Sequence, residues 1–210
     1  MSSDSSQHQK MTLTDHVRLR TRGIVDPIVT VLARLHVSPN ALTILGMLFH
    51  ILFAWLIATG RIWQAGVAIF LLVPLDALDG ALARKLGRAA GGFGAFLDST
   101  LDRIAEIILY AGFMIYFYEQ DEIWFVAAAY VALAGSLMVS YTRSRAEALG
   151  VSCKVGLFTR VERYVVIVLS LIINRPQWGL VLLAIGTTFT VIQRIYHVWN
   201  QMKDRDSEQA

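Results

Sequence analysis

The stretch DALDGALARKLGRAAGGFGAFLDSTLDR, residues 76–103, decides how the chain folds. It contains two pairs of aspartates, Asp76/Asp79 and Asp98/Asp102, at spacings of three and four residues. On a helix, such spacings place both side chains of a pair on one face. The basic, glycine-rich segment 85–92 between the pairs allows the chain to turn back. The stretch therefore predicts two helices whose carboxylates point into the same space.

Four convergent carboxylates repel one another unless cations lie among them. Hard oxygen ligands of this kind suit Mg²⁺ or Mn²⁺ better than Zn²⁺. Two other interpretations are a solvated helix end neutralised by nearby arginines, and the ion path of a transporter. The concentration of the acids at one level favours a metal site, with these predicted ligands: Asp76, Asp79, Asp98 and Asp102.

The rest of the chain has the composition of an integral membrane protein. Of its 210 residues, 55% are hydrophobic and only 17% are charged, and the mean hydropathy is +0.52. Soluble domains are more polar. The net charge of +3 is too small to indicate a nucleic-acid partner. The first forty residues lack the apolar core of a signal peptide, and the single cysteine, Cys153, excludes an internal disulfide.

The pattern along the chain predicts an all-α membrane fold with about six transmembrane helices and an N-terminal surface helix. We expect a disordered tail at 1–11, an amphipathic interfacial helix at 12–36 with a break at Pro27, a transmembrane domain at 38–200, and a polar tail at 201–210. The expected spans are 41–59, a second from 62 into the aspartates, 94–118, 123–144, 157–173 and 178–199. From Ile62 to Asp76 a helix rises roughly 21 Å, which places the carboxylates towards the far side of the bilayer.

The basic residues predict the orientation of the chain in the membrane. Most lysines and arginines fall in the N-terminal segment, the bend, the connection 143–163 and the C-terminal tail, which all lie on one side. Trp63, Trp124 and Trp178 lie at the opposite interface, as an aromatic belt requires. We therefore expect a multi-pass protein of the inner membrane, with both termini and the aspartates facing the cytoplasm.

A second group of polar residues is basic. Arg143, Arg163 and Arg194 come from three different spans at similar depth, where they can converge on an anion. Arg145 and Arg160 fit an anion site and an anchor to lipid headgroups equally well. Glu106 lies one turn further along the Asp98/Asp102 face, where it either supports the aspartates or pairs with a neighbouring polar group.

The aspartate stretch resembles the signature of a known family. Asp76-x-x-Asp79-Gly80-x-x-Ala83-Arg84 followed by Gly94-x-x-x-Asp98-x-x-x-Asp102 is similar to the motif of the CDP-alcohol phosphotransferases, membrane enzymes that make phospholipids. Nine residues separate Arg84 from Gly94, where the family usually has eight.

The resemblance implies a CDP-linked lipid whose pyrophosphate lies over two metal ions, Mg²⁺ or Mn²⁺, held by the four aspartates. It implies contacts to this lipid from Gly80, Ala83 and Arg84, and it makes Asp102 the group that takes the acceptor's proton. Members of the family are commonly homodimers, so a homodimer surrounded by membrane lipids is expected.

Residues 38–199 are most similar to bacterial phosphatidylinositol phosphate synthases. The similarity includes the run at 140–147, Glu162-Arg163 and Gln193-Arg194, although Arg143 and Val161 stand where Lys and Pro are expected. It implies that Arg143, Arg163 and Arg194 hold the phosphate of the acceptor. The expected reaction transfers a phosphatidyl group from CDP-diacylglycerol to inositol 1-phosphate and releases CMP. Glycerol 3-phosphate is the alternative acceptor, and a cation-binding membrane transporter is the alternative from another class.

Overall fold

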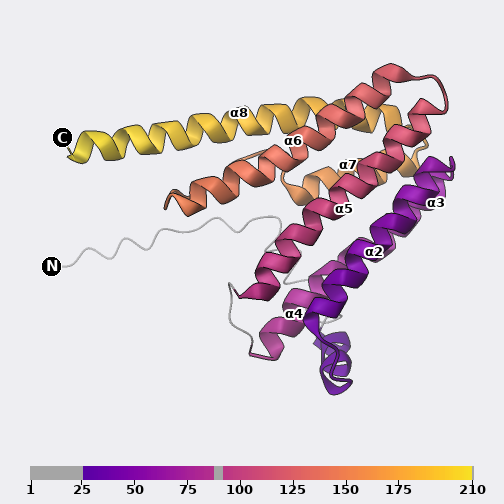
Figure 1. Cartoon of the computed structure of the whole chain (residues 1–210), viewed down its shortest axis with the longest axis horizontal. Helices are drawn as coiled ribbons and strands as arrows, with labels where there is room; N and C mark the ends of the chain where they lie inside the picture. Colours follow the sequence, from indigo (N-terminus) through magenta and orange to yellow (C-terminus); the bar gives the residue numbers. More distant parts are fainter. Residues whose placement is uncertain (1–25, 88–91, 210) are drawn as a thin grey trace.

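The computed structural model describes residues 26–87 and 92–209, and within these ranges it contains helices and no strands. The predicted all-α class is therefore confirmed. Long helices run side by side in the molecule (Figure 1). In chain order the elements are α2 (Pro39–Ala58), α3 (Ile62–Leu72), the 3₁₀ turn η1 (Val73–Asp76), α4 (Ala77–Lys85), α5 (Phe93–Tyr118), α6 (Ile123–Ala148), α7 (Arg160–Ile172) and α8 (Pro176–Gln209).

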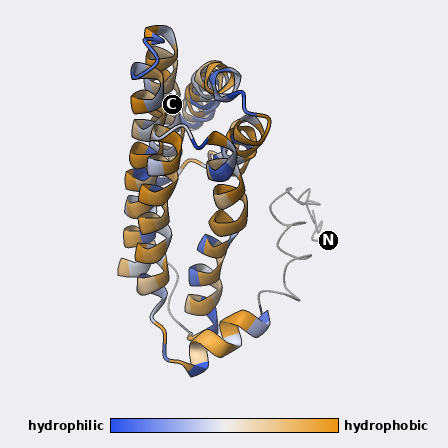
Figure 2. Cartoon of the chain, turned by 90° about the vertical axis from the view of Figure 1, so that its right-hand side faces the viewer, coloured by the Kyte–Doolittle hydropathy of each residue, from blue (hydrophilic) through white to orange (hydrophobic). Residues whose placement is uncertain are grey.

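Four of the predicted spans are long and apolar enough to cross a membrane. These segments are Pro39–Ala58, Ile62–Lys85, Ile123–Ala148 and Pro176–Lys203. Most of the helical surface is hydrophobic (Figure 2). Helix α5 has 26 residues but carries charged side chains, and α7 has only 13 residues, about 20 Å against a hydrocarbon core of about 30 Å. The crossing of the membrane by α5 and α7 stays a prediction.

The helices pack in pairs that hold the site together. Helix α5 lies along α2, α6 lies along α8, and α7 packs against α3 and α8. The backbones of α2 and α5 approach closely at Gly112, where an added Cβ would lie 2.6 Å from the carbonyl oxygen of Ala54. Small residues allow such close packing of membrane helices. Phe53, Leu109 and Phe113 are buried beside this contact, so α2 and α5 are fixed relative to each other about 15 Å along α5 from Asp102.

The second predicted span runs from Ile62 into the aspartates, as the sequence predicted. Its helical form changes just before them, because α3 ends at Leu72 and the chain passes through η1 before α4 begins. Pro74 lies in this turn, and its missing N–H and ring prevent a regular helix. Asp76 is consequently the N-cap residue of α4, one turn away from Asp79.

The N-terminal surface helix lies only partly in the described ranges. Residues 26–34 are helical and include Pro27, while the start of this helix and the predicted break lie at the edge of the described residues. Val29 is buried against Leu78 and Leu82 of α4, and the Lys85 ammonium donates to the Thr30 hydroxyl. The predicted tail at 1–11 and the first part of the helix predicted at 12–36 lie outside the described residues. At the other end, α8 continues to Gln209 through most of the predicted polar tail.

Candidate functional site

The four predicted metal ligands line one small cavity, which we call the carboxylate cavity. Asp76 and Asp79 reach it from the η1–α4 junction, and Asp98 and Asp102 reach it from α5. The other side chains that line it are Thr43, Met47, His50, Leu101 and Ala105. The structure thus brings together both aspartate pairs, as their spacing predicted. Among the described residues, no three His, Cys, Asp or Glu side chains are arranged around one point as a metal ion would require.

Two residues of helix α2 lie directly against two of these carboxylates. The Thr43 hydroxyl donates a hydrogen bond of 2.6 Å to Asp79 Oδ2. A Cβ added to Gly46 would lie only 2.3 Å from Asp76 Oδ1, so a residue larger than glycine would displace this carboxylate. The four carboxylates and the Thr43 hydroxyl offer hard oxygens, the ligands that Mg²⁺ and Mn²⁺ prefer. These residues are not arranged around one point, but their chemistry fits a divalent cation.

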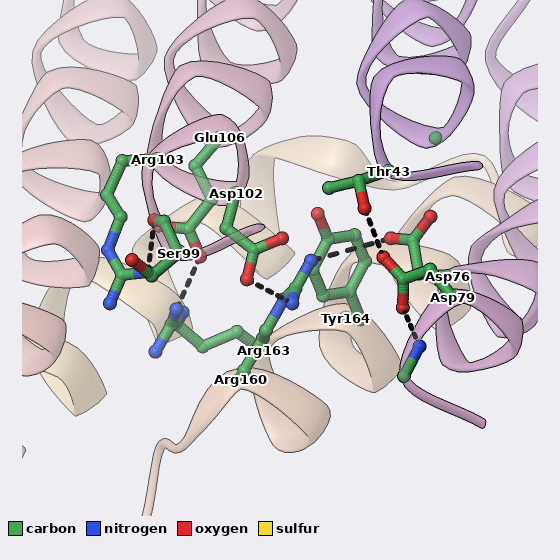
Figure 3. A network of polar contacts seen from close by, with 12 residues as sticks. Thr43, Asp76, Asp79, Ser99, Asp102, Arg103, Glu106, Arg160, Arg163 and Tyr164 are labelled. Carbon is green, nitrogen blue, oxygen red and sulfur yellow. Dashed lines mark hydrogen bonds and ion pairs between the residues drawn. The ribbon is translucent and has the colours of Figure 1, made fainter. Parts of the chain in front are cut away.

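Arg160 links the two aspartate pairs. This residue opens α7, and its guanidinium donates to Asp102 Oδ2 and, over 3.5 Å, to Asp76 Oδ2 (Figure 3). It also lies over the ring of Tyr164, 5.8 Å from the ring centre. An anchor to lipid headgroups, one of the two interpretations of Arg160, would point away from the bundle. The sequence did contain a feature that indicates this inward position: Arg160 shares one face of α7 with Arg163 and Tyr164.

A buried chain of hydrogen bonds through His50 fixes Tyr164, the residue whose ring lies against Arg160. The His50 ring nitrogen Nδ1 lies 2.9 Å from the carbonyl oxygen of Gly46, which can only accept, so Nδ1 carries the proton. His50 Nε2 lies 2.8 Å from the Tyr164 hydroxyl and accepts its hydrogen. The ring of Tyr164 is thereby fixed beneath the guanidinium. The sequence analysis missed this role of His50, because its partner comes from a distant helix.

The three predicted arginines line a second, larger cavity, which we call the arginine cavity. Its volume is about 240 Å³. Arg143 comes from α6, Arg163 from α7 and Arg194 from α8. Arg160 and Asp102 also line it, together with Arg103, Glu106, Val139, Ser140, Ser144, Glu147 and Thr159. The predicted convergence of the three cations is therefore confirmed, and Asp102 lines both cavities.

The three arginines differ in how firmly they are held. Arg163 forms an ion pair with Glu106, and both side chains are buried, 3% and 7% exposed (Figure 3). Of the two interpretations of Glu106, the structure therefore shows the pairing with a neighbouring polar group. Arg194 is buried and donates to the carbonyl oxygens of Val155 and Val139. Arg143 pairs with Glu147 over 2.9 Å, and both side chains are about half exposed.

The predicted lipid-binding residues lie on α4, next to Asp79, whose carboxylate accepts from the Gly80 N–H. Gly80, Ala83 and Arg84 line neither of the two cavities. A Cβ added to Gly80 would lie 3.3 Å from Arg84 Nη1, so the absence of a side chain there leaves room for the guanidinium. Their contact with a CDP-lipid stays a prediction.

Comparison with known proteins identifies the family. Residues 36–192 match the CDP-alcohol phosphatidyltransferase family. The phosphatidylinositol phosphate synthase of Cutibacterium acnes is 33% identical over 202 residues, which cover 89% of this chain and 97% of that protein. The archaetidylinositol phosphate synthase of Pyrococcus horikoshii is 34% identical over 188 residues, which cover 89% and 97% of the two chains.

Solved structures give the same result. The phosphatidylinositol phosphate synthase of Mycobacterium tuberculosis with CDP-DAG bound superposes with a TM-score of 0.79 at 30% identity, over 84% of this chain and 94% of that one. The same enzyme in complex with manganese and citrate gives a TM-score of 0.78 at 30% identity, over 83% and 88%. The motif at residues 76–102, the helical fold and these relatives agree, and the chain belongs to the CDP-alcohol phosphatidyltransferase family.

Proposed function

We propose that this protein transfers the phosphatidyl group of CDP-diacylglycerol to inositol 1-phosphate, giving phosphatidylinositol phosphate and CMP. The observation that carries the proposal is the position of Asp102, which lines both the carboxylate cavity and the arginine cavity. A group that removes the acceptor's proton has to lie between the donor and the acceptor. The inositol phosphate synthases among the relatives support the choice of acceptor.

The carboxylate cavity is the proposed site for the reacting end of the donor. Asp76, Asp79, Asp98 and Asp102 would hold two divalent cations, Mg²⁺ or Mn²⁺, and the Thr43 hydroxyl holds Asp79 in place. Bound there, the cations supply positive charge beside the pyrophosphate of the donor. A solved relative in complex with manganese supports this assignment. Gly80, Ala83 and Arg84 of α4 are the proposed contacts to the nucleotide end of the lipid.

The arginine cavity is the proposed site for the acceptor. Arg143, Arg163 and Arg194 bind its phosphate through charge-assisted hydrogen bonds. Held in this way, the acceptor turns a hydroxyl towards Asp102, whose carboxylate accepts the proton. The hydroxyl oxygen forms a bond to the phosphorus that carries the diacylglycerol, the bond from this phosphorus to CMP breaks, and CMP leaves with the electron pair.

Release of CMP by the purified protein with a panel of acceptors tests the choice of acceptor. We expect the highest kcat/KM with inositol 1-phosphate, a lower value with glycerol 3-phosphate, and a value at least about tenfold lower with free inositol. The reason is that one charge-assisted hydrogen bond contributes about 1.5–3 kcal/mol. Equal rates with inositol and its phosphate would contradict the acceptor site. A transporter would release no CMP with any acceptor.

The membrane orientation is part of the proposal, and cysteine labelling in intact cells tests it. The distribution of lysines and arginines favours a cytoplasmic position for the bend after α4. In a Cys153→Ser background, Leu86→Cys should react with an impermeant maleimide only after the cells are opened. Glu122→Cys, before α6, should react from outside. Labelling of Leu86→Cys in intact cells would show that the orientation is the opposite of the proposed one. The proposed homodimer can be tested by light scattering of the purified protein.

A further inference from the structure

Arg160 has contacts in both cavities. Its side chain lines the arginine cavity, while its guanidinium contacts Asp102 and Asp76 of the carboxylate cavity (Figure 3). The side chain is 38% exposed, so it is less confined than the buried Arg163 and Arg194. Arg160 thus differs from Arg163 and Arg194, because it also contacts aspartates of the carboxylate cavity.

Arg160 contacts two of the four carboxylates that are the proposed metal ligands. Asp102 Oδ2 and Asp76 Oδ2 accept from the guanidinium. Hard cations bind carboxylates through the same lone pairs, and a guanidinium beside a divalent cation is repelled. A metal ion and the Arg160 guanidinium therefore compete for these two oxygens.

The surroundings of Arg160 limit where it can move. Tyr164 lies beneath it and is fixed by His50, so the side chain cannot swing deeper into the bundle. In the other direction lies the arginine cavity, where it would approach Arg143, Arg163 and Arg194. The negative charge of Glu106 balances the positive charge of Arg163, and that of Glu147 balances Arg143. A further positive charge is favourable there when an anion shares the cavity.

We propose that Arg160 is a positioning residue that couples the two cavities. A divalent cation displaces it from Asp102 and Asp76, and the displaced guanidinium turns into the arginine cavity, where it strengthens the binding of the acceptor's phosphate. Because coupling between two binding sites is reciprocal, an anion in the arginine cavity strengthens metal binding to the same degree. The inference rests on the function proposed above and adds to it that metal and acceptor bind cooperatively.

A purely structural role for Arg160 makes a different prediction. If it only ties α7 to α5, its removal lowers the stability of the fold and leaves the relation between the two binding sites unchanged. If it only competes with the metal, its removal strengthens metal binding but does not change the effect of an anion. The discriminating quantity is therefore the anion dependence of metal affinity.

The test is Mn²⁺ binding to the purified protein in detergent. Free Mn²⁺ is measured by electron paramagnetic resonance in chloride and in sulfate at equal ionic strength, with a protein-free blank for ion pairing. Sulfate serves as the probe because it is a tetrahedral dianion. For the wild type we expect sulfate to lower the Kd of Mn²⁺ by at least about fivefold, the lower end of typical coupling.

Arg160→Gln should remove this coupling. Its Kd for Mn²⁺ in chloride should fall below that of the wild type, and sulfate should change it by less than about twofold. Arg175→Gln is the matched control, because Arg175 is exposed just beyond the other end of α7. It should keep the sulfate effect of the wild type. Thermal unfolding of each variant checks its folding.

Three results would overturn the inference. They are the same sulfate effect in Arg160→Gln as in the wild type, Mn²⁺ binding in this variant that is no tighter than in the wild type, and independent binding of Mn²⁺ and sulfate in the wild type. The last result needs no variant, so it decides the matter even if Arg160→Gln does not fold. Failure of the proposed function is recognised separately, since the wild type would then release no CMP from CDP-diacylglycerol.

Discussion

Replacing Asp98 with asparagine should lower the rate of CMP release by at least about a thousandfold. Asp98 lines the carboxylate cavity, and asparagine keeps its size while removing its charge. Metal ions stabilise a transition state by several kcal/mol, and each 1.36 kcal/mol corresponds to a tenfold change in rate. The measurement is kcat for CMP release, together with Mn²⁺ affinity, which should fall in parallel.

Glu119→Gln is the matched control for Asp98→Asn. Glu119 is the exposed C-cap residue at the other end of the same helix, α5, and its replacement removes the same charge. Its activity should stay within about twofold of the wild type, since exposed substitutions away from a site have small effects. An active Asp98→Asn variant, or full activity of the wild type in excess chelator, would remove the basis for the metal site.

Replacing Arg163 with alanine should have two separate effects. The first is on stability, because Glu106 would be left buried without its partner, which costs about 3–5 kcal/mol. The second is on acceptor binding, where the loss of one charge-assisted hydrogen bond should raise the KM for inositol 1-phosphate by about 10- to 100-fold. The KM for CDP-diacylglycerol should change much less, since Arg163 does not line the carboxylate cavity.

The double variant Arg163→Met/Glu106→Leu separates these two effects. Replacing both members of a buried ion pair by apolar residues of similar volume is often neutral for stability, so the unfolding temperature in detergent should recover towards the wild-type value. The KM for the acceptor should remain high, because the cation is still missing. If the double variant also recovered the wild-type KM, Arg163 would act only through the stability of the fold, and its role in phosphate binding would be wrong.

Spacing and depth were enough to predict which aspartates and which three arginines converge. The spacings of three and four residues put each aspartate pair on one helix face, and the matching depth of Arg143, Arg163 and Arg194 predicted their convergence. The break before α4 was also visible in principle, because Pro74 precedes Asp76 by two residues. These features depend on short-range geometry, which a sequence shows directly.

The contacts between helices were not predictable in the same way. A sequence gives the type of a residue and its helix face, but not the partner that a long side chain selects across a helix interface. Arg160 therefore remained open as a lipid anchor, although it contacts Asp102 and Asp76. The function of Gly46 was also hidden, since its lack of a side chain matters only because Asp76 lies against it.

The most direct test of the central claim is the identity of the lipid product. The purified protein is incubated with CDP-diacylglycerol, inositol 1-phosphate and Mg²⁺, and lipids and nucleotides are identified by mass spectrometry. We predict phosphatidylinositol phosphate and CMP in equal amounts, and neither product when Mg²⁺ is replaced by a chelator or when Asp98 is asparagine. CMP without a lipid that carries inositol phosphate, or the same yield in chelator, would contradict the account.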